Sequence, residues 1–204
     1  MSAQGLRSRD LLAFHDGRHA AAGWAKSGAA AHAAGLWQAI EDNHRFNCLL
    51  WDEEDLARRR QVSDAEIAKN KRAIDGFNQR RNDAIERVDE HLLHALAGVI
   101  RQPAARLSSE TAGGMIDRLS ILALKIHHMR LQTRRTDVDA AHIATCEAKL
   151  ARLVEQRTDL GACLDRLLAE AALGQSYFKI YRQFKMYNDP ALNPALYGEK
   201  AASR

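Results

Sequence analysis

Residues 63–97 read SDAEIAKNKRAIDGFNQRRNDAIERVDEHLLHALA, and this stretch decides the fold class. Ser63 with Glu66 three residues later is the capping-box pattern that starts a helix. No proline follows before Gly98, and Gly76 inside the stretch costs a helix only about 1 kcal/mol. The stretch therefore predicts one long helix from Ser63 to about Gly98.

The composition of the whole chain agrees with this helix. Among the 204 residues there are 36 Ala and 24 Leu, whereas Ile, Val and Thr together number 20. Strong helix formers thus outnumber the residues that suit a strand, which excludes a mainly β protein. The 3 prolines leave long stretches in which nothing breaks a helix.

Three further long helices are expected around the first. One runs from Leu36 to about Arg60, a second covers Ile116 to about Gln132 after a cap at Ser109, and a third ends at Gly174. We predict that the capping pattern of Thr136 and Asp139 starts the third, and that residues 99–108 form a loop. The fold class is therefore all-α, an antiparallel bundle of four long helices with short N- and C-terminal helical segments.

The chain divides into three predicted parts. Residues 1–35 form a variable N-terminal segment, with a short helix near residues 11–19 and a mobile connection that is not expected to carry chemistry. Residues 36–174 form the helical bundle. Residues 175–204 form an aromatic and basic C-terminal segment that is expected to pack on the bundle.

A polar layer is predicted inside the first hairpin. Folding its two helices about Val62 pairs Asn47 with Asn78, His44 with Arg81, Trp51 with Ile74 and Glu54 with Lys71. The apolar seams of both helices become polar at this height, so internal hydrogen bonds, water or a ligand must satisfy these groups. Two interpretations stay open. The layer is either a ligand site or a set of buried polar groups that only fixes the helix register, because both give the same pattern.

A second polar stripe follows the long helix at spacings of three and four, with Asp75, Asn78, Asn82, Glu86 and Asp89. Carboxylates at this spacing could hold a hard cation such as Mg²⁺, with Lys71 and Arg81 close enough to bind phosphate. A solvated charged face explains many of the same residues. No metal is therefore assigned, and Asp75, Glu86 and Asp89 are the ligands if one is bound.

The helix after residue 110 is apolar nearly all round, which predicts a central, buried position. Asp117 and Lys125 on this helix are about 12 Å apart along its axis, too far to pair with each other, so their partners must come from other helices. Gly113 and Gly114 weaken its first turn, and we expect them to allow a close approach of backbones there. Free amides at this N-terminus could also bind an anion.

The C-terminal segment alternates aromatic rings with Lys179, Arg182 and Lys185. Packing against the bundle explains the rings, and rings beside cations also suit sugars and phosphates. The ligand-binding candidates are therefore Asn47, Glu54, Arg58, Lys71, Asp75, Asn78, Arg81, Asn82, Glu86, Asp117, Lys125, Lys179 and Arg182.

Several classes of protein are disfavoured. The three cysteines are isolated, the nine histidines contain no zinc-protease motif, and no phosphate-binding or dinucleotide-binding glycine loop occurs. A net charge of +4 without a recognisable module argues against a nucleic-acid binder. No window is apolar enough for a membrane span, and no export signal is visible, so we expect a cytoplasmic protein.

Four blocks carry a resemblance to a bacterial family known as domain of unknown function 4254. They are NCLLWDEEDLARR (47–59), IAKNKRAIDGFNQRRNDAIERVDEHLL (67–93), ETAGGMIDRLSILALKI (110–126) and FKIYRQFKMYNDPALNPALY (178–197). The resemblance implies a setting beside glycosyltransferases of lipopolysaccharide and surface-glycan synthesis. It implies no reaction, cofactor or catalytic residue.

Three functions follow as hypotheses. The first is a cytoplasmic protein of surface-glycan synthesis that binds a phosphorylated sugar, a nucleotide sugar or a glycosyltransferase. The second is an all-α phosphohydrolase that uses Mg²⁺ and acts on a nucleotide or sugar phosphate. The third is a structural bundle that binds partner proteins, and an oligomer is compatible with each. Whether the chain is an enzyme stays open.

Overall fold

The computed structural model describes residues 5–21, 23–182, 186, 189–195 and 197–198. Its helices are α1 (Ser8–Ala20), α2 (Trp24–Ser27), α3 (Leu36–Leu56), α4 (Asp64–Ala95), α5 (Ala112–Thr133) and α6 (Ala140–Ala172), and its strands are β1 (Arg106–Leu107) and β2 (Ser176–Tyr177). The prediction of an all-α bundle with four long helices is confirmed.

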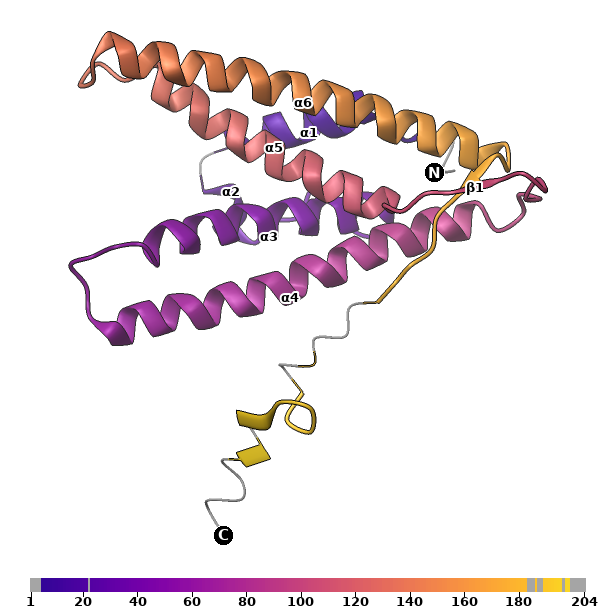
Figure 1. The fold of residues 1–204 in the computed structure, drawn as a ribbon, viewed down its shortest axis with the longest axis horizontal. Helices are drawn as coiled ribbons and strands as arrows, with labels where there is room; N and C mark the ends of the chain where they lie inside the picture. Colours follow the sequence, from indigo (N-terminus) through magenta and orange to yellow (C-terminus); the bar gives the residue numbers. More distant parts are fainter. Residues whose placement is uncertain (1–4, 22, 183–185, 187–188, 196, 199–204) are drawn as a thin grey trace.

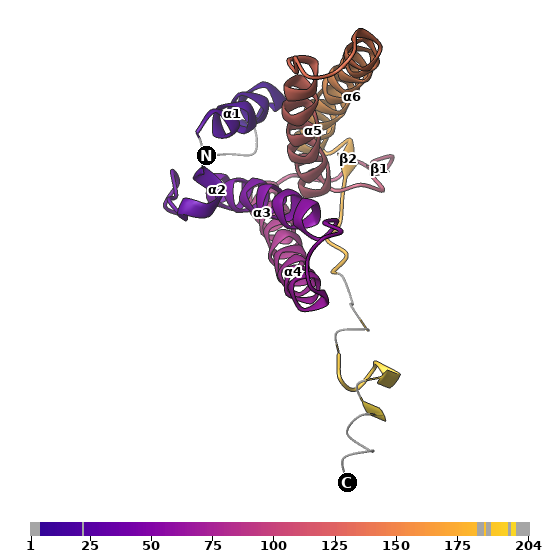
Figure 2. The same cartoon turned by 90° about the vertical axis from the view of Figure 1, so that its left-hand side faces the viewer.

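The four long helices form two hairpins, α3 with α4 and α5 with α6. Figure 1 shows that the hairpins come together near β1 and spread apart toward their turns. Helix α5 contacts α3, α4 and α6, so it holds the central position expected from its apolar surface. Figure 2 shows α1 in the angle between the two hairpins, where it packs on α5 and α6.

The helices begin where side-chain caps are available. Ser63 and Glu66 form the predicted capping box at the start of α4. Helix α5 begins after Thr111, whose hydroxyl accepts from the Gly114 amide, and not after Ser109 as predicted. Likewise Asp139 is itself the cap of α6, with its carboxylate 2.7 Å from the His142 amide. In both helices the side-chain oxygen of the cap accepts a hydrogen bond from the backbone amide three residues further along the chain.

The end of α6 joins the two hairpins. Gly174 has a φ of 70°, and the Gln175 amide donates to the Glu170 carbonyl, as in a Schellman motif. A side chain at Gly174 would clash with the carbonyl of Ile100. The chain then enters β2, which pairs in parallel with β1 in the segment that was predicted to be a loop. Two residues are too few to give a strand periodicity.

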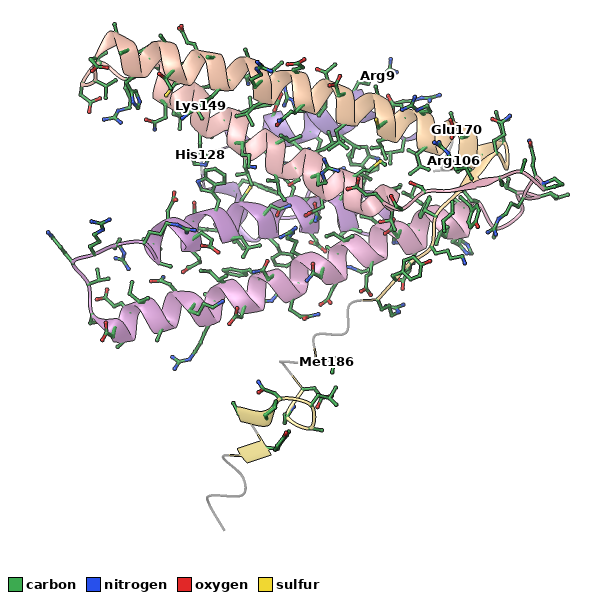
Figure 3. The ribbon with its side chains drawn as sticks, in the orientation of Figure 1. Arg9, Arg106, His128, Lys149, Glu170 and Met186 are labelled. Atoms are coloured by element: carbon green, nitrogen blue, oxygen red, sulfur yellow. The ribbon has the colours of Figure 1, made fainter. Side chains whose placement is uncertain are left out.

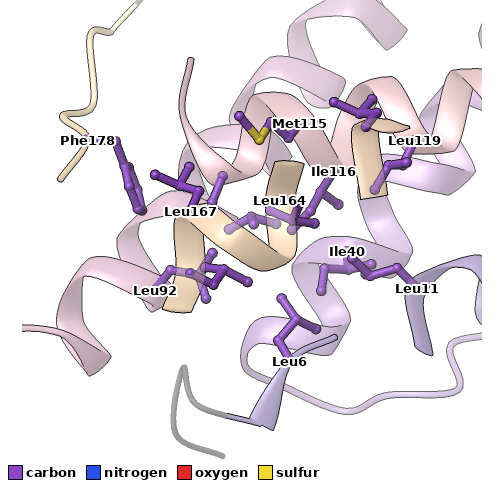
Figure 4. Close-up of a cluster of buried hydrophobic side chains, with 14 of the residues drawn as sticks. Leu6, Leu11, Ile40, Leu92, Met115, Ile116, Leu119, Leu164, Leu167 and Phe178 are labelled. Carbon is purple, nitrogen blue, oxygen red and sulfur yellow. The ribbon is translucent and has the colours of Figure 1, made fainter. Parts of the chain in front are cut away.

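The hydrophobic core lies where the hairpins come together. Figure 4 shows Leu11 of α1, Ile40 of α3 and Leu164 of α6 in one cluster with residues of α4 and α5. Phe178 is 2% exposed in this cluster, so the C-terminal segment packs on the bundle at this point. The described residues from 189 onward lie away from the bundle in Figure 1, and Phe184, Lys185 and Tyr187 lie outside the described residues.

The two glycines at the start of α5 have different environments. A Cβ at Gly113 would lie 2.6 Å from the carbonyl oxygen of Ile85, so this glycine allows α4 and α5 to approach closely, as predicted. A Cβ at Gly114 would meet nothing closer than 3.4 Å, so the same prediction is wrong for Gly114.

The connection between α1 and α3 is held by two buried side chains of α3. Arg45 donates to the carbonyls of Trp24, Ala25 and Ala29, and the Glu41 carboxylate accepts from the amides of Ala31 and His32. Burial opposes ionisation of Glu41, but these hydrogen bonds outweigh it and lower its pKa. The predicted mobile connection is therefore tied to the bundle.

Across the described residues, no helix has the length and apolar character that crossing a membrane requires.

Candidate functional site

Asp117 is the centre of a buried hydrogen-bond network between α3, α4 and α5. Its carboxylate is 3% exposed and accepts two hydrogen bonds from Arg81, Nε to Oδ1 at 2.8 Å and Nη2 to Oδ2 at 2.7 Å. Such paired contacts are the strongest geometry for a guanidinium and a carboxylate. The prediction that Asp117 finds its partner on another helix is confirmed.

Three residues of α3 and one of α5 complete this network. Asn43 and Asn47 donate to Asp117 Oδ1 at 2.8 and 2.9 Å, and Asn47 also lies 3.0 Å from Ser120 Oγ. Ser120 Oγ lies 2.8 Å from Nδ1 of His44. We call Asn43, His44, Asn47, Arg81, Asp117 and Ser120 the Asp117 network. Its carboxylate has four donors, so it needs no ligand for its stability.

The polar side chains that were predicted to pair across the first hairpin have other partners. Asn47 bonds to α5, and Asn78 Oδ1 accepts only a long contact of 3.5 Å from Arg81. Glu54 pairs with Arg58 at 2.6 Å and Lys71 with Asp75 at 2.7 Å, so the predicted pair of Glu54 and Lys71 is wrong. All four of these charged side chains are exposed. Lys71 and Asp75 lie one turn apart on α4, whereas Arg58 lies just beyond the end of α3 and reaches back to Glu54.

The acidic stripe of α4 does not converge on one point. Asp75 pairs with Lys71, and Glu86 pairs with Arg182 at 2.6 Å, while Arg182 also holds Glu90. Asn82, Glu86 and Asp89 line one cleft of about 390 Å³, which Arg81 and Asp117 also line, and Lys179 is exposed. Within the described ranges, the one convergent group of three or more His, Cys, Asp or Glu side chains contains none of these residues.

Asp89 lies at the start of α5. It is 2% exposed, and its Oδ1 accepts from the Gly113 amide at 2.6 Å. Burial raises its pKa to about 6, against the hydrogen bonds from the Thr111 hydroxyl and the Gly113 amide. Asp89 thus holds the end of α4 to the start of α5, and the free amides expected at this N-terminus already have an anion.

An open cleft lies between the end of α3 and the α5–α6 hairpin. It has a volume of about 570 Å³, and we call it the Trp51 cleft. It is lined by Trp51, Asp55, Lys125, His128, Met129, Gln132, Lys149, Arg152, Leu153 and Gln156. In Figure 3, the labelled His128 and Lys149 lie near each other toward the turns of the two hairpins.

The Trp51 cleft combines aromatic rings with cations. Trp51 stacks on His128 with centroids 4.3 Å apart and planes 10° apart, and burial lowers the pKa of His128. Lys125, Lys149 and Arg152 are exposed, and in the described part of the chain no ion pair joins any of them. The prediction that Lys125 is a buried charge is wrong, because its position on α5 faces the cleft between the hairpins.

A smaller cleft of about 360 Å³ adjoins the first and shares Trp51 and Asp55 with it. The structure brings five of the candidates predicted from the sequence together here, namely Asn47, Glu54, Arg58, Asn78 and Arg81.

Lys149 and Arg152 of the Trp51 cleft were missed as candidates. Their signal was present, because Lys149, Arg152 and Gln156 recur at spacings of three and four on one face of α6.

A cluster of histidines was also missed. His15 and His44 are completely buried, with ring centroids 4.5 Å apart, and His19 lies 5.0 Å from His44 and 4.7 Å from His127. Burial lowers the pKa of His15 to about 3 and of His19 to about 4. The available signal was two pairs at spacing four on separate helices, His15 with His19 and His44 with Cys48.

Comparison with known proteins gives a family and no relative of known activity. No curated protein matches the chain significantly, and no solved structure does so either. One family matches residues 37–180, which include all of α3 except Leu36, helices α4 to α6 and both strands. The chain therefore belongs to the family described as protein of unknown function DUF4254.

Proposed function

We propose that this protein binds a phosphorylated sugar or a nucleotide sugar in the Trp51 cleft, as a cytoplasmic protein of bacterial surface-glycan synthesis. The observation that carries the proposal is the set of Lys125, Lys149 and Arg152 around this cleft. Three cations face one carboxylate, Asp55, and none of the three is neutralised by an ion pair among the described residues. Such a set favours an anionic ligand such as a phosphate.

The rings beside these cations support a ligand that carries a ring as well as a phosphate. Trp51 borders both clefts, and Nε1 of its indole is buried with no hydrogen-bond partner in the described structure. An aromatic face next to cations suits the apolar face of a sugar or base. The two clefts together have room for a ligand with two parts, with Arg58 and Arg81 at the second.

The biological setting rests on the family resemblance. Surface-glycan synthesis uses nucleotide sugars and sugar phosphates, and a glycosyltransferase is the partner that would share such a ligand. The phosphohydrolase hypothesis needs carboxylates that converge on a metal. Asp75 and Glu86 are held by cations and Asp89 by the start of α5, so no observation favours that hypothesis.

Calorimetric titration tests the proposal directly. The full chain is titrated with UDP-glucose, with glucose 1-phosphate and with glucose, at low and at high salt. We expect the two phosphorylated ligands to bind more weakly as salt rises, and glucose alone not to bind. Replacement Lys149→Glu or Arg152→Glu should weaken binding at least about tenfold, since it turns an attraction into a repulsion.

Lys69→Glu is the matched control, because Lys69 is exposed on α4 and lines none of the clefts described above. It should bind like the parent chain. The proposal fails if neither phosphorylated ligand binds the parent, or if the charge reversals in the cleft leave binding as strong as in the control.

A further inference from the structure

His19, His44 and Cys48 meet in the interior between α1 and α3. Each offers one ligand atom, and the three atoms lie within 4.8 Å of one another. His44 and Cys48 are one turn apart on α3, and Nε2 of His44 lies 3.9 Å from Sγ of Cys48. Around a tetrahedral zinc ion, a nitrogen and a sulfur ligand are about 3.5 Å apart. Small shifts of side chains would therefore complete the geometry.

One ligand nitrogen of this group and two nitrogens beside it have no hydrogen-bond partner among the described residues. Nε2 of His19 is buried and makes no hydrogen bond in the described structure, and the same holds for both ring nitrogens of the neighbouring His15. A buried polar atom without a partner costs about 1 to 3 kcal/mol. An interior that gathers several such atoms at one place is therefore better explained by a ligand than by packing.

The two histidines differ in their access to solvent. His44 is fully buried, whereas His19 is partly exposed and leaves a route by which an ion could reach the site.

The second nitrogen of His44 is already oriented. Its Nδ1 lies 2.8 Å from Ser120 Oγ, which belongs to the Asp117 network. Metal-binding histidines usually donate the other ring N–H to such a partner, which fixes the tautomer and the direction of the ring. With Nδ1 on Ser120, Nε2 is the atom that faces Cys48.

From this geometry we propose that His19, His44 and Cys48 form a binding site for a divalent transition metal, with Zn²⁺ as the ion that their chemistry favours. Two imidazoles and one thiolate are borderline-soft ligands that suit Zn²⁺ rather than Mg²⁺. Three protein ligands leave a fourth position for water or a substrate atom. This proposal does not depend on the sugar-phosphate proposal, since the Trp51 cleft shares no residue with the site.

Cobalt provides the spectroscopic test, because a thiolate bound to tetrahedral Co²⁺ gives a charge-transfer band that free Co²⁺ lacks. The full chain is stripped with a chelator and titrated with Co²⁺, then with Zn²⁺. We expect the band to saturate at one equivalent, to vanish when Zn²⁺ displaces Co²⁺, and Zn²⁺ to raise the melting temperature.

Variants locate the site. Cys48→Ser should abolish the band, and His19→Gln should weaken binding by more than the roughly 10- to 100-fold expected for the supporting variant Ser120→Ala. Cys163→Ser and His91→Ala are the matched controls, since Cys163 lies on α6 and His91 is exposed on α4. Both should bind Co²⁺ like the parent chain.

Two outcomes overturn the proposal, namely no band in the parent chain or an equal band in Cys48→Ser. Circular dichroism checks that each variant is folded. If Cys48→Ser fails to fold, His19→Gln decides alone, because the His19 side chain is only partly buried and its loss leaves the Asp117 network intact.

Discussion

The Asp117 network and the histidine cluster are neighbours that share His44, and each has a fully or almost fully buried polar side chain at its centre, Asp117 in the network and His15 in the cluster. In the network the Asp117 carboxylate accepts four hydrogen bonds from three side chains. In the cluster His15 has no hydrogen-bond partner for either ring nitrogen within the described structure, although it is 0% exposed. The difference separates a polar group whose partners are all supplied by the fold from one that has none among the described residues.

The comparison also explains why the predicted polar layer is not the best candidate for a ligand site. Asn47 and Arg81 satisfy Asp117, so at this height the layer fixes how α3, α4 and α5 fit together. Side-chain nitrogens without a hydrogen-bond partner among the described residues include those of His15 and His19 in the histidine cluster and of Trp51 at the Trp51 cleft.

Removing the centre of the network should have the largest effect. Asp117→Ala leaves Arg81, Asn43 and Asn47 without their acceptor, and we expect a loss of about 3 to 5 kcal/mol in the free energy of unfolding. Urea denaturation measures this loss. Asp75→Ala is the matched control, because its exposed pair with Lys71 should contribute less than about 1 kcal/mol. Equal stability of Asp117→Ala and the control would show that the network is not structural.

Asp89 is an intermediate case, a buried carboxylate with hydrogen-bond donors but no ion pair in the described residues. Its pKa is raised from 3.8 to about 6, so the folded state binds the proton more tightly. The resulting stability is present below pH 3.8 and is lost as the pH rises through 6. Over this window the loss amounts to about 3 kcal/mol, taking 1.36 kcal/mol for each pH unit.

Asp89→Asn removes this dependence while keeping an oxygen for the Gly113 amide. Relative to the parent chain, the variant should therefore gain stability as the pH rises from 4 to 7, by up to about 3 kcal/mol. Urea denaturation at each pH unit gives the difference. A difference that is constant across these pH values would mean that Asp89 does not titrate in this window.

Replacing an unsatisfied ring should have the smallest effect, with the opposite sign to Asp117→Ala. We expect His15→Leu, measured without metal at pH 7, to leave the free energy of unfolding unchanged or to raise it by about 1 kcal/mol. Removing a buried polar group without partners relieves its desolvation, while the stacking on His44 is lost. If His15→Leu lost as much free energy of unfolding as Asp117→Ala, His15 would be part of a stabilising network, and the contrast between the Asp117 network and the histidine cluster would not hold.

The sequence predicts the helices well because their signals are local. The capping box of Ser63 and Glu66 and the long stretches without proline lie within single helices. The hairpin of α3 and α4 follows from them. The position of Asp117 on an apolar helix is also sufficient to predict that its partner lies elsewhere.

The candidate sites depend on contacts that no local signal contains. The sequence predicted that Arg81 pairs with His44 across the hairpin. In the structure α5 packs against both helices of the hairpin, and Arg81 donates its hydrogen bonds to Asp117 of α5. His19 reaches His44 from the short N-terminal helix, on which the sequence predicted no site residue. Lys125 was expected to be buried because the helix around it is apolar, and only the spread of the two hairpins exposes it.

The turn at Gly174 and the short β1–β2 pair join the two hairpins at one end, and the hairpins spread apart at the other end. A rotation of one hairpin against the other would therefore pivot at the joined end. From Gly113 to Gln132, helix α5 is a lever about 28 Å long. A rotation of about 5° at the pivot would move its far end by about 2.5 Å. A small change of packing at the joined end would therefore change the width of the Trp51 cleft, almost a whole helix length away.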